Sequence, residues 1–131
     1  MLYLTTFIAA LVIHVLDDFG FQHFTHLNEL KQKAWWTEQL KKYPALDARL
    51  YKHDYIVCLM LHAFKWTCLT MVPMLIAFGL PSAWTLALLV IFSTAAHAFI
   101  DDLKANKLKI SLLQDQAMHV LQLIVSIAVL A

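Results

Sequence analysis

The sequence predicts an all-α protein, a four-helix transmembrane bundle with a cytoplasmic amphipathic helix between its first and second spans. Hydrophobic residues make up 61% of the 131 residues, against about 45–50% in soluble domains. Four apolar stretches each approach the roughly 20 residues needed to cross the hydrocarbon core of a bilayer. No stretch alternates polar and apolar residues as a barrel strand does, so helices remain as the structure that satisfies the backbone in lipid.

The four predicted spans, which together form one membrane domain, cover residues 2–21, 55–80, 83–100 and 110–131. The first span is expected to be a retained helix, because the sequence before it lacks a basic segment and no small-residue cleavage site follows. Pro81 and Ser82 predict a tight turn between the second and third spans.

The connection of residues 22–54 is the polar part of the chain, and it contains the predicted amphipathic helix. Apolar residues from Leu27 to Leu40, with Trp35 and Trp36 among them, indicate this helix. Pro44 should end it at Tyr43, because proline disfavours helical backbone in the residue before it. A basic helix with paired tryptophans suits a membrane surface. A solvated helix that caps the bundle is an equal alternative.

Basic residues predict the orientation of the bundle. Among the connections and termini, six lysines and arginines lie in the first connection, three in the third and none elsewhere. The positive-inside rule then places the first and third connections in the cytoplasm and both termini outside the plasma membrane. The net charge of +1 argues against nucleic acid as a partner. A homo-oligomer is compatible with the sequence.

Histidines and aspartates recur at one depth of the predicted bundle. One histidine falls in each span, near its cytoplasmic end, and three of the four have an aspartate four residues away, on the same helix face. The residues are His14 with Asp18, His62, His97 with Asp101, and His119 with Asp115. Since an ionisable group in a membrane costs roughly 2.5–3.5 kcal/mol at the centre, these side chains should face one another and not lipid.

Imidazole and carboxylate groups together are the usual ligands of divalent transition-metal ions. The seven residues therefore form a candidate site for one or two ions, with zinc first and manganese or iron as alternatives. Hydrogen bonds among aspartate, histidine and lysine would satisfy the same cluster without an ion.

Three further residues are candidates for catalytic roles beside this site. Asp17 and Asp102 adjoin the histidine–aspartate pairs but are expected to point partly away, and either could serve as a general base. Lys65 lies three residues after His62 and could stabilise negative charge. A metal-dependent hydrolase acting on a lipid-linked or phosphorylated substrate at the cytoplasmic face would use these groups.

Four short motifs resemble those of a family of small bacterial and phage integral-membrane proteins of unknown function. The matching residues are His14-x-x-x-Asp18-Phe19-x-x-Gln22, His62-Ala63, His97-x-x-x-Asp101-x-x-Lys104 and Asp115-Gln116-x-x-His119. The resemblance spans nearly the whole chain but implies no activity. A weaker likeness to membrane-bound metal-dependent hydrolases implies metal chemistry at intramembrane histidine and aspartate.

Three other functions remain open from the sequence. A non-enzymatic envelope protein would bind a partner through the basic connection of residues 22–54. An ion- or proton-translocating bundle would use the same acids and histidines, although the outer two-thirds of the bundle is expected to be wholly apolar. A haem bundle would use the histidines alone.

Overall fold

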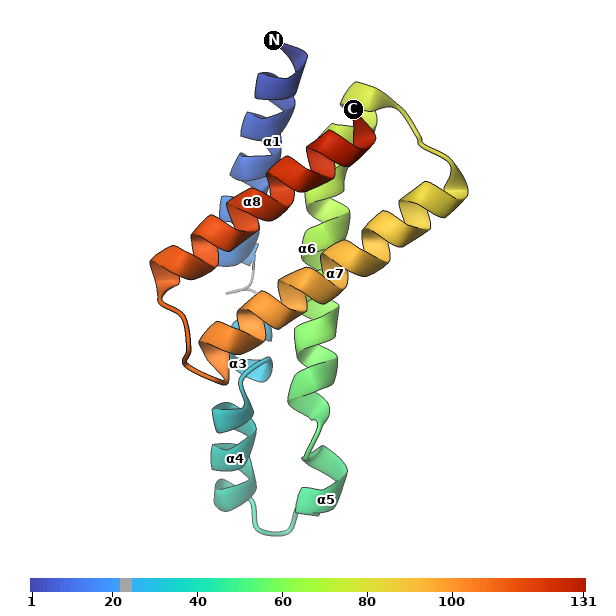
Figure 1. The fold of residues 1–131 in the computed structure, drawn as a ribbon. Coiled ribbons are helices and arrows are strands. Elements are labelled where there is room, and N and C mark those ends of the chain that lie inside the picture. The colour runs from blue at the N-terminus through green and yellow to red at the C-terminus, as the bar shows by residue number, and fades with distance from the viewer. Residues whose placement is uncertain (22–24) are drawn as a thin grey trace.

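The computed structural model describes residues 1–21 and 25–131. All regular secondary structure in this part of the chain is helical, and it contains no strand (Figure 1). Gln22, the last residue of the first motif, lies outside the described part. Four described segments are long and apolar enough to cross a membrane: Leu2–Phe21, Ala48–Phe78, Ala83–Ala105 and Leu112–Leu130. The predicted all-α bundle is confirmed, and the four segments are consistent with a multi-pass membrane protein.

The first span is one continuous rod with a change of helix type, and the other three spans are α-helices. The elements in order are α1 (Leu2–Leu16), the π-helix η1 (Asp17–Phe21), α3 (Leu27–Leu30), α4 (Lys33–Lys42), α5 (Ala48–Tyr51), α6 (Asp54–Phe78), α7 (Ala83–Ala105) and α8 (Leu112–Leu130). The α7 helix runs past residue 100, where the predicted span stops, and so carries Asp101 and Lys104 on helical backbone.

Local sequence signals explain where the helices begin and end. The Ser82 hydroxyl accepts a hydrogen bond from the Thr85 N–H at 3.1 Å and caps α7. Ser111 and Gln114 form a reciprocal capping box at the start of α8. At the end of α6, Gly79 takes a φ of +84°, a left-handed value that suits glycine. The α4 helix ends at Lys42, and Tyr43 is its C-cap before Pro44, as predicted. The amphipathic helix predicted from Leu27 to Leu40 is divided, because Lys31 and Gln32 separate α3 from α4.

Both chain termini lie at one end of the molecule, and α3, α4 and α5 lie at the other (Figure 1). The α7–α8 connection lies near α3, because Asn106 accepts a hydrogen bond from the Lys33 N–H and donates one to the Lys31 carbonyl. The two connections that carry the basic residues therefore share one end. This arrangement agrees with the charge pattern, whichever side of a membrane that end occupies.

The tryptophan pair of α4 is partly used to hold the first connection together. The Trp36 indole donates a hydrogen bond to the Leu30 carbonyl at 2.7 Å and stacks on Tyr51, with ring centroids 6.1 Å apart. Trp35 packs edge-on against Trp36. These contacts tie α4 to α3 and α5, and they favour a helix that packs at the end of the bundle over one that offers both rings to lipid.

Small and large apolar side chains interlock where the spans cross. The main cluster contains Ala10, Trp66, Met74, Leu123 and Ile127, from α1, α6 and α8. Buried hydroxyls lie beside it, so the expectation of a wholly apolar outer bundle is wrong. Thr70 donates to the Trp66 carbonyl, and Thr94 donates to Thr67. A hydroxyl that donates to a carbonyl of its own helix, as Thr70 does, or to a hydroxyl of a neighbouring helix, as Thr94 does, is inexpensive in lipid.

Truncation of Leu123 to alanine should lower the free energy of unfolding in detergent by about 2–4 kcal/mol, because it opens a cavity in the main cluster. Leu123 is only 1% exposed, whereas Leu113 on the same helix is 81% exposed. The Leu113→Ala control should change stability by about 0.5 kcal/mol or less. Equal losses from the two variants, measured by denaturant titration, would contradict this packing.

Candidate functional site

The four span histidines lie together inside the bundle, at one level, between α1, α6, α7 and α8. His14 is 1% exposed, and His62, His97 and His119 are fully buried. Asp101 and Asp115 are buried beside them. We call these six residues, with Asp17 and Asp18, the His/Asp layer. Since each span contributes at least one member, the layer exists only when all four helices pack.

Three imidazoles and one carboxylate converge most closely within this layer. The Nε2 atoms of His62 and His97 are 3.1 Å apart. The Asp101 carboxylate lies 3.3 Å from Nε2 of His62 and 3.2 Å from Nε2 of His119. Its distance to Nε2 of His97 is 3.9 Å. His97, Asp101 and His119 are close enough to hold one metal ion, and so are Asp18, His62 and His97.

Asp101 has a fourth neighbour, Lys31, which comes from the first connection. Lys31 follows α3, and its ammonium group forms a buried ion pair with Oδ2 of Asp101. Its side chain is only 9% exposed. The Asp101 carboxylate is therefore shared among three histidines and one lysine. His97 lies one turn before Asp101 on the same helix, α7, whereas the other three come from other elements of the fold.

Aromatic stacking sets the orientation of these rings. Trp66, His97 and His119 form a stack in which each adjacent pair of ring centroids is 4.2 Å apart. The interplanar angles are 21° and 28°. Trp66 thus supports the rings from the apolar side of the layer, and the packing of its neighbours restricts their rotation.

His14 belongs to a separate hydrogen-bond chain. The Trp66 indole N–H donates to Nδ1 of His14 at 2.8 Å, so Nδ1 must be an acceptor. Neutral His14 then carries its proton on Nε2, which lies 3.1 Å from Oε1 of Gln116. The Gln116 amide donates to Asp18 at 3.2 Å and to Asp115 at 3.1 Å. Both nitrogens of His14 are therefore used within the protein.

The π-helix η1 turns Asp17 into the bundle. We expected Asp17 to point partly away, but its side chain is fully buried, and it pairs with Lys65 of α6 at 2.7 Å. A π-helix adds a residue to the turn and changes which side chain faces inward. Asp18, four residues after His14, keeps a contact of 3.7 Å with that ring.

Asp102 lies outside the layer. Its carboxylate pairs with Lys107 at 2.8 Å and accepts a hydrogen bond from Asn106 at the end of α7. The expectation that it points away from the histidines is confirmed. Nothing in these contacts favours Asp102 as a general base for the cluster.

Lysines neutralise the buried acids. Asp17 pairs with Lys65, Asp101 with Lys31, and Asp115 with Lys104. The sequence argument expected a metal ion to neutralise these carboxylates, but the described lysines already do so. Any case for a metal must therefore rest on the converging imidazoles and not on uncompensated charge.

Four residues of the layer's surroundings were not assigned to the site from the sequence: Lys31, Trp66, Lys104 and Gln116. Gln116 and Lys104 sit within recognised motifs, so their spacing offered a signal. The sequence around Lys31 gave no signal of its role, because Lys31 lies 70 positions from Asp101 in a polar connection that is expected to be solvated. Trp66 has no ionisable group, and its hydrogen bond to His14 depends on the packing of α1 against α6.

Comparison of this chain with protein-family models, with curated proteins and with solved structures found no match. The geometry described above is therefore the basis for any functional conclusion.

The Asp17–Lys65 pair provides a test of the layer's electrostatics. Lys65→Met should destabilise the protein by about 3 kcal/mol, because it leaves a buried carboxylate without its partner. The double variant with Asp17→Asn should recover most of this loss, measured by unfolding in detergent as a double-mutant cycle. A Lys65→Met loss that the second substitution does not reduce would show that the two groups are not coupled.

Proposed function

We propose that this chain is a membrane-embedded metal protein in which the imidazoles of His62, His97 and His119 bind one divalent transition-metal ion, with zinc first among candidates. We further propose that it is a hydrolase. The single observation that supports the metal is the convergence of three buried Nε2 atoms on the Asp101 carboxylate. Three imidazole nitrogens are a known ligand set of catalytic zinc.

The spacing of these donors suits a small tetrahedral site. Ligands about 2.0–2.1 Å from a tetrahedral zinc ion lie about 3.3 Å from one another. Nε2 of His62 lies 3.1 Å from Nε2 of His97. The Asp101 carboxylate oxygens lie 3.3 Å from Nε2 of His62 and 3.2 Å from Nε2 of His119. The separation of 3.9 Å between His97 and Asp101 is longer. His62 with His97, and His97 with His119, belong to two neighbouring donor groups, so binding of one ion by all three imidazoles requires the side chains to move together.

A second reading, a polar layer without an ion, has its own support. The lysine partners already neutralise the buried acids. Nδ1 of His97 and Nδ1 of His119 have no hydrogen-bond partner among the described residues, whereas a metal-bound imidazole usually donates its second N–H to an acceptor. The two readings differ in one measurable quantity, the metal content of the protein.

The hydrolytic part of the proposal depends on Asp101. A catalytic zinc site keeps one position open for water, and the Asp101 carboxylate lies within 3.9 Å of Nε2 of all three histidines, where it could accept a proton from that water. A bound divalent ion would supply Lewis-acid activation of that water. Asp101 would take a proton from the water and pass it to the leaving oxygen, while the water oxygen bonds to the ester centre and the ester bond breaks.

The ligand set is narrower than the seven residues that the sequence suggested. His14 is omitted because both of its ring nitrogens already have partners. Asp115 is omitted because Lys104 and Gln116 hold it. Asp18 remains as the donor of an alternative group with His62 and His97.

We place the layer at the cytoplasmic side of the plasma membrane, with both termini outside, on the positive-inside rule. A hydrolase there would meet lipid-linked or phosphorylated substrates from the cytoplasm. The same motifs support our proposal that the chain belongs to the small membrane-protein family described above, since three of the four motifs contain one of the imidazoles or Asp101.

Other functions have less support. A relay across the membrane needs titratable groups along its path, but residues 67–95 and 120–130 contain no Asp, Glu, Lys, Arg or His. A haem between His62 and His97 has no room, because their Nε2 atoms are 3.1 Å apart. Partner binding through the first connection has less support, because Trp36 already packs against Leu30 and Tyr51 within the chain.

Metal content is the decisive measurement for the metal site. Protein purified in mild detergent without added metal should contain about one divalent ion per chain by elemental analysis. His97→Ala should reduce this to background, because it removes the ring shared by both candidate groups. His53→Ala is the matched control, since His53 is exposed near the start of α6 and should not change the metal content.

Absence of metal from the wild-type protein, together with no thermal stabilisation on adding zinc, would contradict the metal site and support the ion-free layer. Zinc at about 100 times its dissociation constant should otherwise stabilise the protein by about 2.7 kcal/mol. A chelator should reverse this shift.

Asp101→Asn separates metal binding from hydrolysis. The amide can still accept a hydrogen bond from Lys31, but it cannot take a proton from water. The variant should retain its ion while losing at least about 100-fold in rate. The assay measures phosphate released from phosphatidic acid and fatty acid released from phosphatidylglycerol in mixed micelles. Metal-loaded wild-type protein that turns over neither substrate would contradict the hydrolase assignment.

A further inference from the structure

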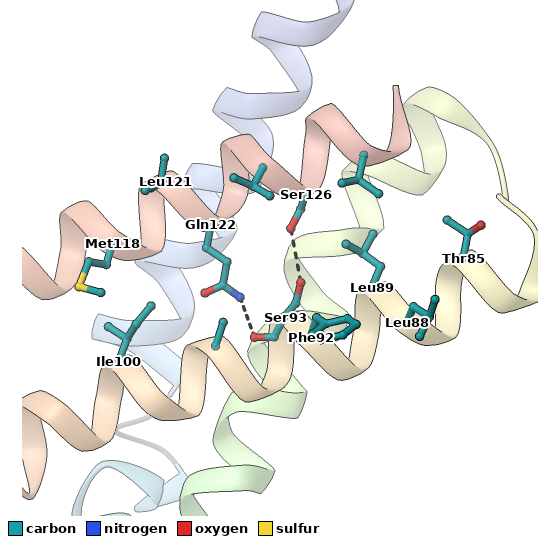
Figure 2. A pocket seen from close by; sticks show the side chains of 13 residues that line it. Thr85, Leu88, Leu89, Phe92, Ser93, Ile100, Met118, Leu121, Gln122 and Ser126 are labelled. Carbon is teal, nitrogen blue, oxygen red and sulfur yellow. Dashed lines mark hydrogen bonds between the residues drawn. The ribbon is translucent and has the colours of Figure 1, made fainter.

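An apolar groove runs along the outside of the bundle between α7 and α8 (Figure 2). Its volume is about 600 Å³, within the range of about 300–1,000 Å³ that is typical of ligand sites. The residues that line it are Thr85, Leu88, Leu89, Phe92, Ser93, Ala96, Ile100, Met118, Leu121, Gln122, Val125, Ser126 and Val129. Both helices are candidate membrane spans, so in a bilayer this groove faces hydrocarbon.

A polar bridge keeps the two helices together beneath the groove. The Gln122 amide donates to the Ser93 carbonyl at 2.7 Å, and the hydroxyls of Ser93 and Ser126 are 3.5 Å apart (Figure 2). Small side chains at these positions leave room, while Phe92 and Leu121 form walls. These contacts therefore fix the spacing of α7 and α8 at the groove, while Oε1 of Gln122 has no hydrogen-bond partner among the described residues.

The groove ends beside the His/Asp layer. Ile100 and Met118 line the end nearest the layer, and they immediately precede Asp101 and His119 in sequence. From Thr85 to Ile100 the helix rises about 22 Å, which is a large part of the roughly 30 Å hydrocarbon thickness. A single extended hydrocarbon chain matches this length and lining better than a compact ligand does.

Positive charge lies where the groove ends. Lys104 is one helical turn beyond Ile100 on the same face of α7. Its side chain pairs with Asp115 but remains 38% exposed, and Lys107 is 47% exposed. Oδ1 of Asp115 is 3.5 Å from Nε2 of His119. An anionic group bound at Lys104 would thus be next to the candidate metal site.

We propose that the α7–α8 groove binds the acyl chain of an anionic phospholipid, whose phosphate group lies at Lys104, and that this lipid is the substrate. The proposal rests on the proposed hydrolase function, because it names the class of molecule that the site acts on. The occupant is a lipid from the surrounding membrane, which enters sideways between α7 and α8.

Two neighbouring alanines provide a matched test. Ala96 lines the groove and Ala95 does not, and both are exposed on α7. Ala96→Trp should fill the groove and weaken retention of added phosphatidylglycerol by at least about tenfold, measured by native mass spectrometry of protein in detergent. Ala95→Trp should retain the lipid as the wild type does. Equal retention by both variants would overturn the proposal.

The head-group part is tested with phosphatidylcholine of the same chain length. Wild-type protein should prefer phosphatidylglycerol, and so should Asp115→Asn. The double variant Lys104→Gln with Asp115→Asn, which leaves no buried carboxylate without its lysine, should lose that preference. The absence of any preference in the wild type would overturn the assignment of the phosphate to Lys104. If the wild type is a dimer that Ala96→Trp converts to a monomer, a second copy and not a lipid occupies the groove.

Metal content measured on the same samples keeps the two proposals distinguishable. Ala96→Trp should keep its ion while losing lipid, because the substitution fills a groove outside the ligand set. If Ala96→Trp loses lipid but neither it nor the wild type contains metal, the groove assignment holds and the metal site is contradicted. If Ala96→Trp keeps both its metal and its lipid, the metal site holds and the groove assignment is contradicted.

Discussion

The Asp101 carboxylate is the group on which the interior of this protein depends. A carboxylate inside an apolar bundle must be paired and hydrogen-bonded, or it will not remain charged. Here it is held by His62 from α6, His119 from α8 and Lys31 from the first connection. A single side chain thereby joins three elements to α7. These contacts link the spans to one another and α3 to the bundle.

Much of this arrangement follows from patterns in the sequence. Hydropathy predicts the four spans, and the i, i+4 spacing predicts an imidazole and an acid on one face of the first, third and fourth spans. The charge of each group then requires that these faces meet, since lipid cannot solvate them. The end of α4 was also predictable, because Pro44 disfavours helical backbone in the residue before it. The helix signals are local in the sequence. The meeting of the polar faces follows from the high cost of exposing ionisable groups to lipid.

The remaining features depend on packing that no local pattern encodes. The π-helix η1 turns Asp17 inward, and an ideal 3.6-residue period cannot anticipate the added residue. Lys31 has an ordinary charged sequence around it, and only the fold brings it to Asp101. The buried hydroxyls of Thr67, Thr70 and Thr94 were hidden because hydropathy averages them with their apolar neighbours. Their hydrogen bonds stay within helices or join adjacent ones.

The ring nitrogens that carry protons differ between a layer with an ion and a layer without one. Without an ion, His62 and His119 must each carry a proton on Nε2 to donate to Asp101. His97 then accepts at Nε2 from His62 and carries its own proton on Nδ1, where it has no partner among the described residues. One N–H of His62 would serve two acceptors, which weakens both bonds. With an ion, all three Nε2 lone pairs are used, but His119 as well as His97 must then hold an Nδ1 proton without a described acceptor. Each arrangement leaves a buried donor unsatisfied, so neither is a fully relaxed core. A polar layer of this kind is costly to keep for structure alone, since apolar residues would pack these helices at lower cost.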